Sequence, residues 1–129
     1  MIVLDASALL EVLLQTPAAS RVSRRIFAPG ETLHAPHLID VEIAQVLRRY
    51  ARSGAISPDR GAAALADLAD LPLHRYPHFV LLPRIWQLRH NFTAYDAACL
   101  ALAEALDAPL LTRDRALASA GGGVQVEVL

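Results

Sequence analysis

Two short apolar runs near opposite ends of the chain each lead into an aspartate. Met1–Leu4 directly precedes Asp5, and Leu110–Thr112 lies just before Asp114. Runs this short and apolar are typical of strands buried on both faces of a sheet. Between them, helical patterns alternate with brief apolar segments, which indicates an α/β fold with a mainly parallel central sheet flanked by helices. The carboxyl ends of parallel strands share one edge, so we expect both aspartates at that edge.

Capping and helix-breaking residues place the remaining elements. Thr93 is a suitable N-cap for the helix that follows it, Gly54 ends the longest helix, and Pro72 stops the Ala- and Leu-rich helix that Ser57 opens. We expect strands at 1–4, 33–35, 73–76, 110–112 and 124–128, and helices at 8–14, 18–27, 36–52, 58–71, 79–89, 94–106 and 115–119. No repeat or long linker divides the chain, so we expect a single domain over 1–129.

Composition limits the classes of protein that the chain can represent. Cys99 is the only cysteine, so no internal disulfide is possible, and we expect a small core residue in a reducing compartment. No apolar run approaches the roughly 20 residues of a membrane span, and no basic segment precedes Met1–Leu4. We therefore expect a cytoplasmic protein with no membrane contact. The net charge of −1 confines any nucleic-acid contact to a local patch, although all twelve basic residues are arginines.

Four acidic residues stand out by their positions. Asp5 and Asp114 follow strands, Glu42 lies on a helix among apolar neighbours, and Asp96 falls in the first turn of its helix. If that helix starts at the carboxyl edge of the sheet, all four carboxylates face one cleft. Clustered carboxylates repel one another unless a divalent cation offsets their charge. A site made only of oxygen ligands suits Mg²⁺ or Mn²⁺ rather than zinc.

Each acid also has a structural interpretation. Asp5 can cap the helix that follows it, and Asp96 forms a Thr93-x-x-Asp96 capping-box pattern. Asp114 can be a turn residue, and Glu42 can be a solvated helix position favoured by the helix dipole. The joint pattern, above all two strand-end acids far apart in sequence, favours a functional cluster.

Four segments together resemble the PIN domains of VapC-type toxins. They are Val3-Leu4-Asp5-Ala6-Ser7-Ala8-Leu9, Asp40-Val41-Glu42, Asn91-Phe92-Thr93-Ala94-Tyr95-Asp96-Ala97-Ala98 and Leu111-Thr112-Arg113-Asp114. They occur in the order of that family and extend nearly end to end. The resemblance implies a three-layer PIN-like fold and an endoribonuclease that uses Mg²⁺ or Mn²⁺ to hydrolyse RNA. It also implies a homodimer and a VapB-like antitoxin partner.

The resemblance also assigns expected roles to individual residues. Asp5, Glu42, Asp96 and Asp114 match the catalytic acids, with the three aspartates at the metal. Ser7 and Thr112 match small hydroxyl positions that support the acids. Separately, Asn91, Arg89 and Arg113 lie close to these segments, where each can contact a substrate phosphate or only satisfy local backbone groups.

Other residues and functions fit the sequence less well. The five histidines show no convincing zinc spacing with Cys99, and Trp86 and Tyr50 are expected in the core or a dimer interface.

Phosphotransfer through an aspartyl phosphate would need a lysine, and the chain has none. A non-catalytic module would be favoured by a missing acid, whereas all four are present. Cleavage of DNA by a structure-specific nuclease stays open, although those proteins usually carry elements for which this chain is too short.

Overall fold

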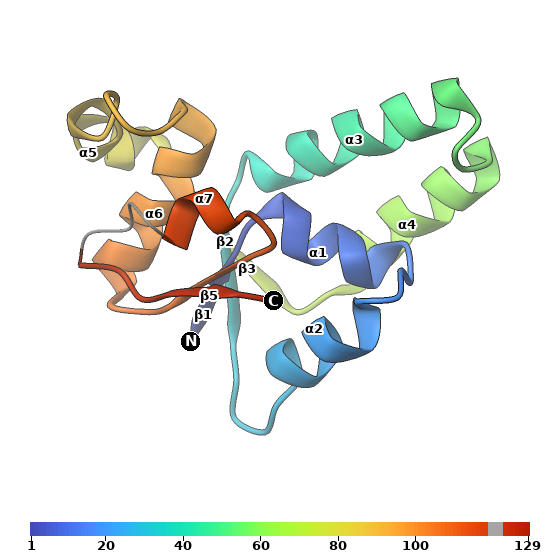
Figure 1. Cartoon of the computed structure of the whole chain (residues 1–129), viewed down its shortest axis with the longest axis horizontal. Helices are drawn as coiled ribbons and strands as arrows, with labels where there is room; N and C mark the ends of the chain where they lie inside the picture. The colour runs from blue at the N-terminus through green and yellow to red at the C-terminus, as the bar shows by residue number, and fades with distance from the viewer. Residues whose placement is uncertain (119–122) are drawn as a thin grey trace.

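The computed structural model describes residues 1–118 and 123–129, and its centre is a parallel sheet (Figure 1). The strand order is β3-β2-β1-β4-β5, and every pairing is parallel. The first two strands in the chain are β1 (Ile2–Leu4) and β2 (Leu33–Pro36), followed by β3 (Leu73–Tyr76), β4 (Leu110–Thr112) and β5 (Val126–Val128). The expected α/β fold with a parallel sheet is confirmed, and the described sheet is wholly parallel.

Helices cover both faces of the sheet and make three layers (Figure 1). One side carries α1 (Ala6–Leu13), α2 (Ala19–Ile26), α3 (Ile39–Ser53) and α4 (Pro58–Asp70). The other side carries a short 3-10 helix η1 (Phe79–Leu81), α5 (Leu82–Gln87), α6 (Ala94–Leu106) and α7 (Arg115–Ala118).

The side chains of the strands alternate between two hydrophobic cores. Ile2 and Leu4 pack with α1 to α4, whereas Val3 packs with α6 on the opposite face. The same alternation sends Leu111 to the first core and Leu110 to the second. Because both faces of β1 and β4 are fully covered, the strand ends that carry Asp5 and Asp114 are held in fixed positions.

Most expected boundaries lie within two residues of the observed ones, and the exceptions have local causes. The helix expected at 79–89 is divided into η1 and α5, because Pro83 in the first turn of α5 has no N–H to continue a helix from the preceding turn. Pro36 ends β2, and α3 begins only at Ile39 after a turn. Gly54 ends α3 as expected, in a left-handed conformation with φ of 80°.

The C-terminal part also differs slightly from expectation. The last strand is Val126–Val128, shorter than the 124–128 expected. Ser119 of the expected last helix and residues 121–122 of the expected glycine loop lie outside the described residues. Within the described ranges, no helix is both long enough and apolar enough to cross a membrane.

Candidate active site

Asp5 lies where β1 ends and α1 begins, and its carboxylate is almost completely buried. Oδ1 accepts hydrogen bonds from the Ser7 hydroxyl at 2.7 Å and from the backbone N–H of Ala8 at 3.0 Å. Asp5 is therefore the N-cap of α1, as its structural interpretation predicts. The cap fixes the rotamer of Asp5, so this role positions the carboxylate rather than competing with a functional one.

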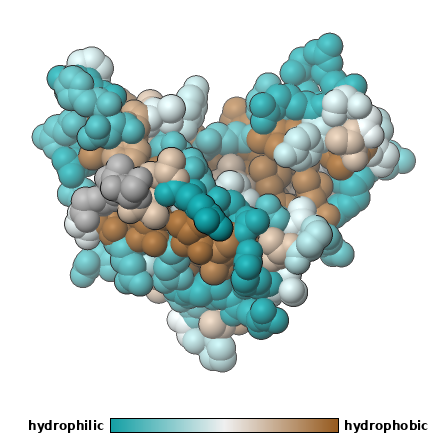
Figure 2. Space-filling view, in the orientation of Figure 1, coloured by the Kyte–Doolittle hydropathy of each residue, from teal (hydrophilic) through white to brown (hydrophobic). Residues whose placement is uncertain are grey.

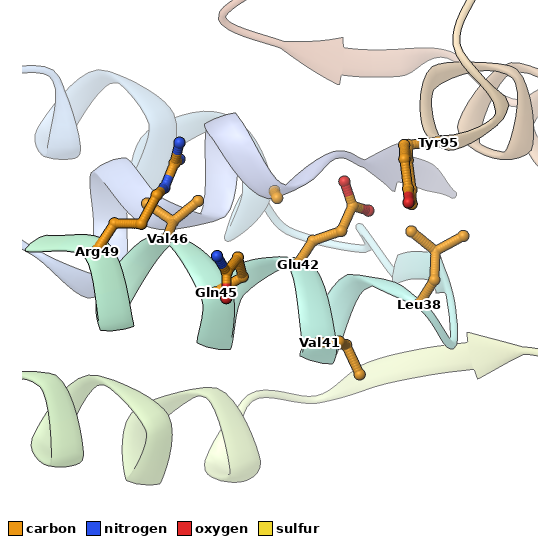
Figure 3. Close-up of a pocket in the computed structure, with 8 residues that line it drawn as sticks. Leu38, Val41, Glu42, Gln45, Val46, Arg49 and Tyr95 are labelled. Carbon is orange, nitrogen blue, oxygen red and sulfur yellow. The ribbon is translucent and has the colours of Figure 1, made fainter.

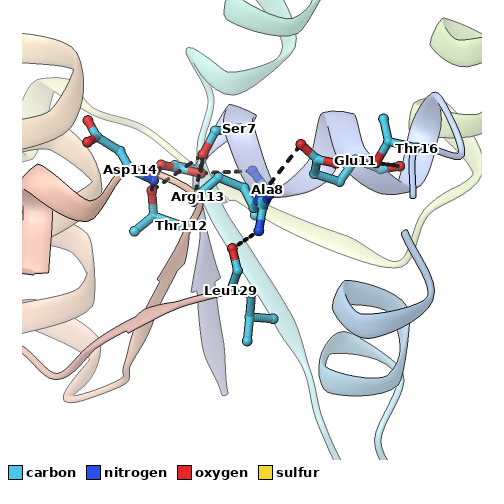
Figure 4. A network of polar contacts seen from close by, with 9 residues as sticks. Ser7, Ala8, Glu11, Thr16, Thr112, Arg113, Asp114 and Leu129 are labelled. Carbon is cyan, nitrogen blue, oxygen red and sulfur yellow. Dashed lines mark hydrogen bonds and ion pairs between the residues drawn. The ribbon is translucent and has the colours of Figure 1, made fainter. Parts of the chain in front are cut away.

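Thr112 joins the ends of β1 and β4 (Figure 4). Its buried hydroxyl donates to Oδ2 of Asp5 and accepts the backbone N–H of Asp114 at 3.0 Å. The Ser7 hydroxyl lies 3.4 Å from that of Thr112 and accepts the backbone N–H of Arg113 at 3.0 Å. The two hydroxyls that were expected to support the acids thus contact Asp5 directly and bind the backbone beside Asp114.

Asp114 lies at the exposed end of this network and caps the short helix α7. Its Oδ1 accepts the backbone N–H of Ala116 at 2.9 Å. The turn role that the sequence allows for Asp114 is therefore present. Its second carboxylate oxygen, Oδ2, has no partner among the described hydrogen bonds.

Glu42 and Asp96 reach the same edge from two helices. Glu42 lies in the first turn of α3, and Asp96 in the first turn of α6, where the Thr93 hydroxyl accepts the Asp96 backbone N–H at 3.2 Å. Both side chains are half-buried. Helix N-termini favour negative charge, so each helix stabilises the acid in its first turn.

The pKa values of the acids show that they interact. Burial, then the charges of Asp5 and Asp96, raise the pKa of Glu42 to about 7. Burial, then the charges of Asp5 and Asp114, raise the pKa of Asp96, while its bond with Thr93 lowers it. Burial also raises the pKa of Asp5, with hydrogen bonds from Ser7, Thr112 and Ala8 opposing that shift. The four expected acids therefore form one electrostatically coupled cluster, here called the acid cluster.

The donor chemistry of the acid cluster fits a hard divalent cation. The acid cluster offers only carboxylate oxygens as ligands. Its negative charges repel one another unless a positive charge compensates them. Among residues 1–118 and 123–129, no three His, Cys, Asp or Glu side chains already lie close enough together to ligate an ion. A bound cation would therefore have to draw these side chains inward.

An open pocket of about 600 Å³ lies beside the acid cluster (Figure 3). We call it the α3 pocket; it is lined by Ala6, Leu38, Val41, Glu42, Gln45, Val46, Arg49 and Tyr95. Figure 2 shows a hollow in this part of the surface, between the end that carries α5 and the end that carries α3 and α4. Glu42 belongs to both the acid cluster and the α3 pocket, so the two are continuous.

The expected phosphate-contacting residues have local partners. The guanidinium of Arg113 lies 3.5 Å from a carboxylate oxygen of Glu11 and donates to the carbonyl of Leu129. Arg89 lies 4.6 Å above the ring of Trp86 and donates to the carbonyl of that residue. The backbone N–H of Asn91 donates to Leu88. These contacts favour the structural interpretation of Arg89 and Arg113, and any role in substrate binding stays a prediction.

Several aromatic, histidine and cysteine side chains also have defined environments. Cys99 is buried in the core, as expected, and burial raises the pKa of its thiol. His34 shares hydrogen bonds with Thr32 and Tyr76. Trp86 and Tyr50 are exposed, which excludes the core for both, and a place in a dimer interface stays a prediction.

Tyr95 is one of the pocket residues that sequence reasoning missed. Its spacing predicts the apolar face of α6, yet the side chain is 62% exposed. Its place in the sequence could have indicated a role at the site, because Tyr95 precedes Asp96 in the first turn of α6, where a side chain can extend past the sheet edge.

The fold and site together define the class of protein: an all-parallel α/β domain with an acid cluster at the carboxyl edge of its sheet. The model of the PIN domain family matches residues 2–123, and the chain belongs to that family. It is also similar over nearly its full length to curated VapC ribonucleases.

Among these relatives, Ribonuclease VapC12 of Mycobacterium tuberculosis is 42% identical over 130 residues, which cover 100% of this chain and 99% of that protein. Ribonuclease VapC1 of the same organism is 46% identical over 121 residues, covering 93% and 90%.

Solved structures share the fold at lower identity. VapC20 of M. tuberculosis, a Sarcin-Ricin loop cleaving toxin, has a TM-score of 0.72 and 15% identity, with 94% of this chain and 95% of that chain covered. VapBC2 from Rickettsia felis, solved bound to a DNA fragment from its promoter, has a TM-score of 0.70 and 14% identity, covering 99% and 98%.

Proposed function

We propose that this chain is a metal-dependent endoribonuclease that acts as the toxin of a toxin–antitoxin pair and is neutralised by a VapB-like antitoxin. One PIN domain over residues 1–129 would carry this activity. The observation that carries the proposal is the electrostatic interaction of four carboxylates at one edge of the sheet. The similarity to two ribonucleases, one 42% and the other 46% identical to this chain, supports it.

Asp5, Asp96 and Asp114 would hold Mg²⁺ or Mn²⁺, with Glu42 as a direct ligand or one acting through water. Oδ1 of Asp5 already accepts two hydrogen bonds, whereas Oδ2 accepts one from Thr112. A carboxylate oxygen has two lone pairs, so Oδ2 is the Asp5 atom that keeps one available for a cation. Oδ2 of Asp114 is similarly available beside the cap that its Oδ1 makes.

The reaction is hydrolysis of a phosphodiester. A water oxygen forms a bond to phosphorus and gives up a proton, the bond from phosphorus to the 3′-oxygen breaks, and that oxygen takes up a proton as it leaves. A divalent cation at the acid cluster would supply charge neutralisation of the phosphate and a lower pKa for the attacking water. The 2′-hydroxyl takes no part, so the products carry 5′-phosphate and 3′-hydroxyl ends.

Incubating the purified chain with total RNA, and sequencing the new 5′ ends with a ligation that requires a 5′-phosphate, tests this proposal. We expect cleavage with Mg²⁺ or Mn²⁺ and none with EDTA. Cleavage in EDTA, or products with cyclic phosphate ends, would contradict a metal-dependent hydrolysis. A single-stranded DNA of matching sequence should stay intact, which separates ribonuclease from deoxyribonuclease activity.

We also propose that the chain forms a homodimer. The segment from η1 to α5 leaves large hydrophobic side chains exposed, namely Phe79, Val80, Leu82 and Trp86. Several large hydrophobic side chains exposed along one short segment favour an interaction surface there.

A further inference from the structure

The α3 pocket has no part in holding a cation apart from Glu42, yet it opens beside the acid cluster. We propose that the α3 pocket holds one nucleobase of a single-stranded RNA, next to the phosphate that lies at the acid cluster. Tyr95 would be the stacking surface for that base, and Arg49 would contact a neighbouring phosphate. This inference rests on the proposed function, because it names the part of the substrate that the site recognises.

The apolar part of the α3 pocket is suited to the flat face of a base. Tyr95 and Val41 are 62% and 73% exposed, and Leu38 lines the pocket close to them (Figure 3). In the described structure, no hydrogen bond is made by the Tyr95 hydroxyl, and no stacked aromatic partner covers its ring. Bases of single-stranded nucleic acids stack on such exposed aromatic rings, since every base has a π-face.

The polar part of the pocket is suited to the edge of a base and to a phosphate. Glu42, Gln45 and Arg49 recur at i, i+3 and i+7, which places them on one face of α3 (Figure 3). The exposed amide of Gln45 offers both a donor and an acceptor. The Arg49 guanidinium makes no ion pair among the described residues, which leaves its donors available to a phosphate.

The size and position of the pocket favour a nucleotide over other occupants. A volume of about 600 Å³ lies within the range of roughly 300–1,000 Å³ found for small-molecule sites. An apolar wall, an amide and a guanidinium match the three parts of a nucleotide: ring face, base edge and phosphate. Because Glu42 also belongs to the acid cluster, a base in the pocket would lie beside the scissile phosphate.

Binding of short RNAs tests the proposal independently of cleavage. Fluorescein-labelled hexanucleotides of A, C, G and U are titrated with the chain in Ca²⁺, which also prefers oxygen ligands, and followed by anisotropy. Intact length is checked on a gel. We expect Tyr95→Leu to raise the Kd of the preferred hexanucleotide on the order of 10- to 100-fold, the range for losing one stacked base. Tyr95→Phe should stay close to wild type, because it keeps the ring.

Salt dependence tests the role of Arg49. Arg49→Gln should reduce the slope of log affinity against log salt by about 0.7, the value for one phosphate contact on a single strand. Tyr50→Leu and Arg48→Gln are the matched controls. Both residues are exposed on α3 and neither lines the pocket, so both variants should leave the Kd and the slope unchanged.

Three outcomes would overturn the pocket assignment: no hexanucleotide binds, Tyr95→Leu leaves the Kd unchanged, or Tyr95→Leu alters only self-association in light scattering. If wild type cleaves RNA while Tyr95→Leu keeps the same Kd and the same cleavage sites, the nuclease function stands and the pocket assignment fails. If hexanucleotides bind in a Tyr95-dependent way and neither Mg²⁺ nor Mn²⁺ supports cleavage, the pocket assignment stands and the nuclease proposal fails.

Discussion

The hydroxyl of Thr112, at the end of β4, donates a hydrogen bond to Oδ2 of Asp5, at the end of β1, across 107 residues of sequence. Both groups are buried, and the same hydroxyl accepts the backbone N–H of Asp114. One side chain thus sets the position of two acids that the sequence separates widely. The acid cluster depends on the pairing of β1 with β4 as much as on the acids themselves.

We expect Thr112→Val to damage both stability and cleavage. Valine has nearly the same shape but leaves a buried carboxylate oxygen and a backbone N–H without a partner, which costs about 1–3 kcal/mol. The pKa of Asp5 should rise further, because the Thr112 hydrogen bond lowers it. Urea unfolding and an RNA cleavage rate measure the two effects. Thr16→Val, which removes a hydroxyl outside the acid cluster, is the control, and an equal loss in both variants would argue against a special role for Thr112.

Asp96→Asn should abolish cleavage while the fold stays intact. Loss of one proposed metal ligand should lower activity by more than about 100-fold, beyond the 10- to 100-fold cost of changes in the outer shell of a metal site. The backbone N–H of Asp96 still donates to Thr93, so the cap on α6 is kept. Without metal, thermal stability should hold or rise, because one of several repelling charges is gone. An unfolded variant would instead show that Asp96 serves mainly as part of a helix cap.

The metal-free protein should become less stable as pH rises from about 4.5 to about 7. The pKa of Glu42 is raised from 4.5 to about 7 in the fold, so the folded state binds more protons than the unfolded state within that window. The contribution of Glu42 to stability therefore falls as pH increases through the window and levels off above it. Denaturant midpoints in EDTA across this range provide the measurement. Glu42→Gln should remove this fall. Because the lowered pKa of His34 acts in the opposite sense, the test is the difference between the two profiles, and identical profiles in wild type and Glu42→Gln would contradict the shift.

A dimer should depend on the exposed hydrophobic segment from η1 to α5. Light scattering should give twice the 13.9 kDa mass of the chain, and Trp86→Ser should shift the mass toward the monomer. Phe27→Ser is the matched control, since Phe27 is also a large exposed aromatic residue but lies at the end of α2. A wild-type monomer at micromolar concentration would exclude the homodimer.

Local sequence signals predicted the helices and strands well where a single type of residue determines the backbone conformation. Thr93 caps α6, Gly54 ends α3 with a positive φ, and apolar runs mark β1 and β4. The expectation that acids gather at the carboxyl edge follows from parallel topology alone. The raised pKa values of Asp5, Glu42 and Asp96 agree with that expectation, because each includes the charge of at least one other acid of the cluster, Asp114 among them.

What the sequence leaves undetermined is mostly long-range. The contact of Thr112 with Asp5 requires β4 to lie next to β1, and no local pattern encodes strand order. Tyr95 has the spacing of a buried residue on α6, but the first turn of that helix extends beyond the core. The α3 pocket likewise depends on where α1 and α6 begin relative to α3, because Ala6 and Tyr95 line it together with residues of α3.

Expression of this chain alone should arrest growth, and co-expression of the small reading frame upstream should relieve the arrest. If the chain is the proposed toxin, the free ribonuclease would degrade cellular RNA, so the acid cluster would have to be blocked in the resting cell. The carboxylates of half-buried Glu42 and Asp96 and exposed Asp114 suggest how: a partner could place an arginine or lysine against them, taking the place of the proposed metal's charge and closing the path of the substrate.

The charge of the partner segment provides the sharper test. Replacing its basic residue by glutamine should weaken inhibition, and raising Mn²⁺ should compete with the wild-type partner, because both would neutralise the same carboxylates. Asp96→Asn should be non-toxic and still soluble, which controls for toxicity from overexpression. If wild type accumulates, degrades RNA in vitro and leaves growth unaffected, the chain is a ribonuclease outside a toxin–antitoxin pair, and the antitoxin part of the proposal fails while the nuclease part stands.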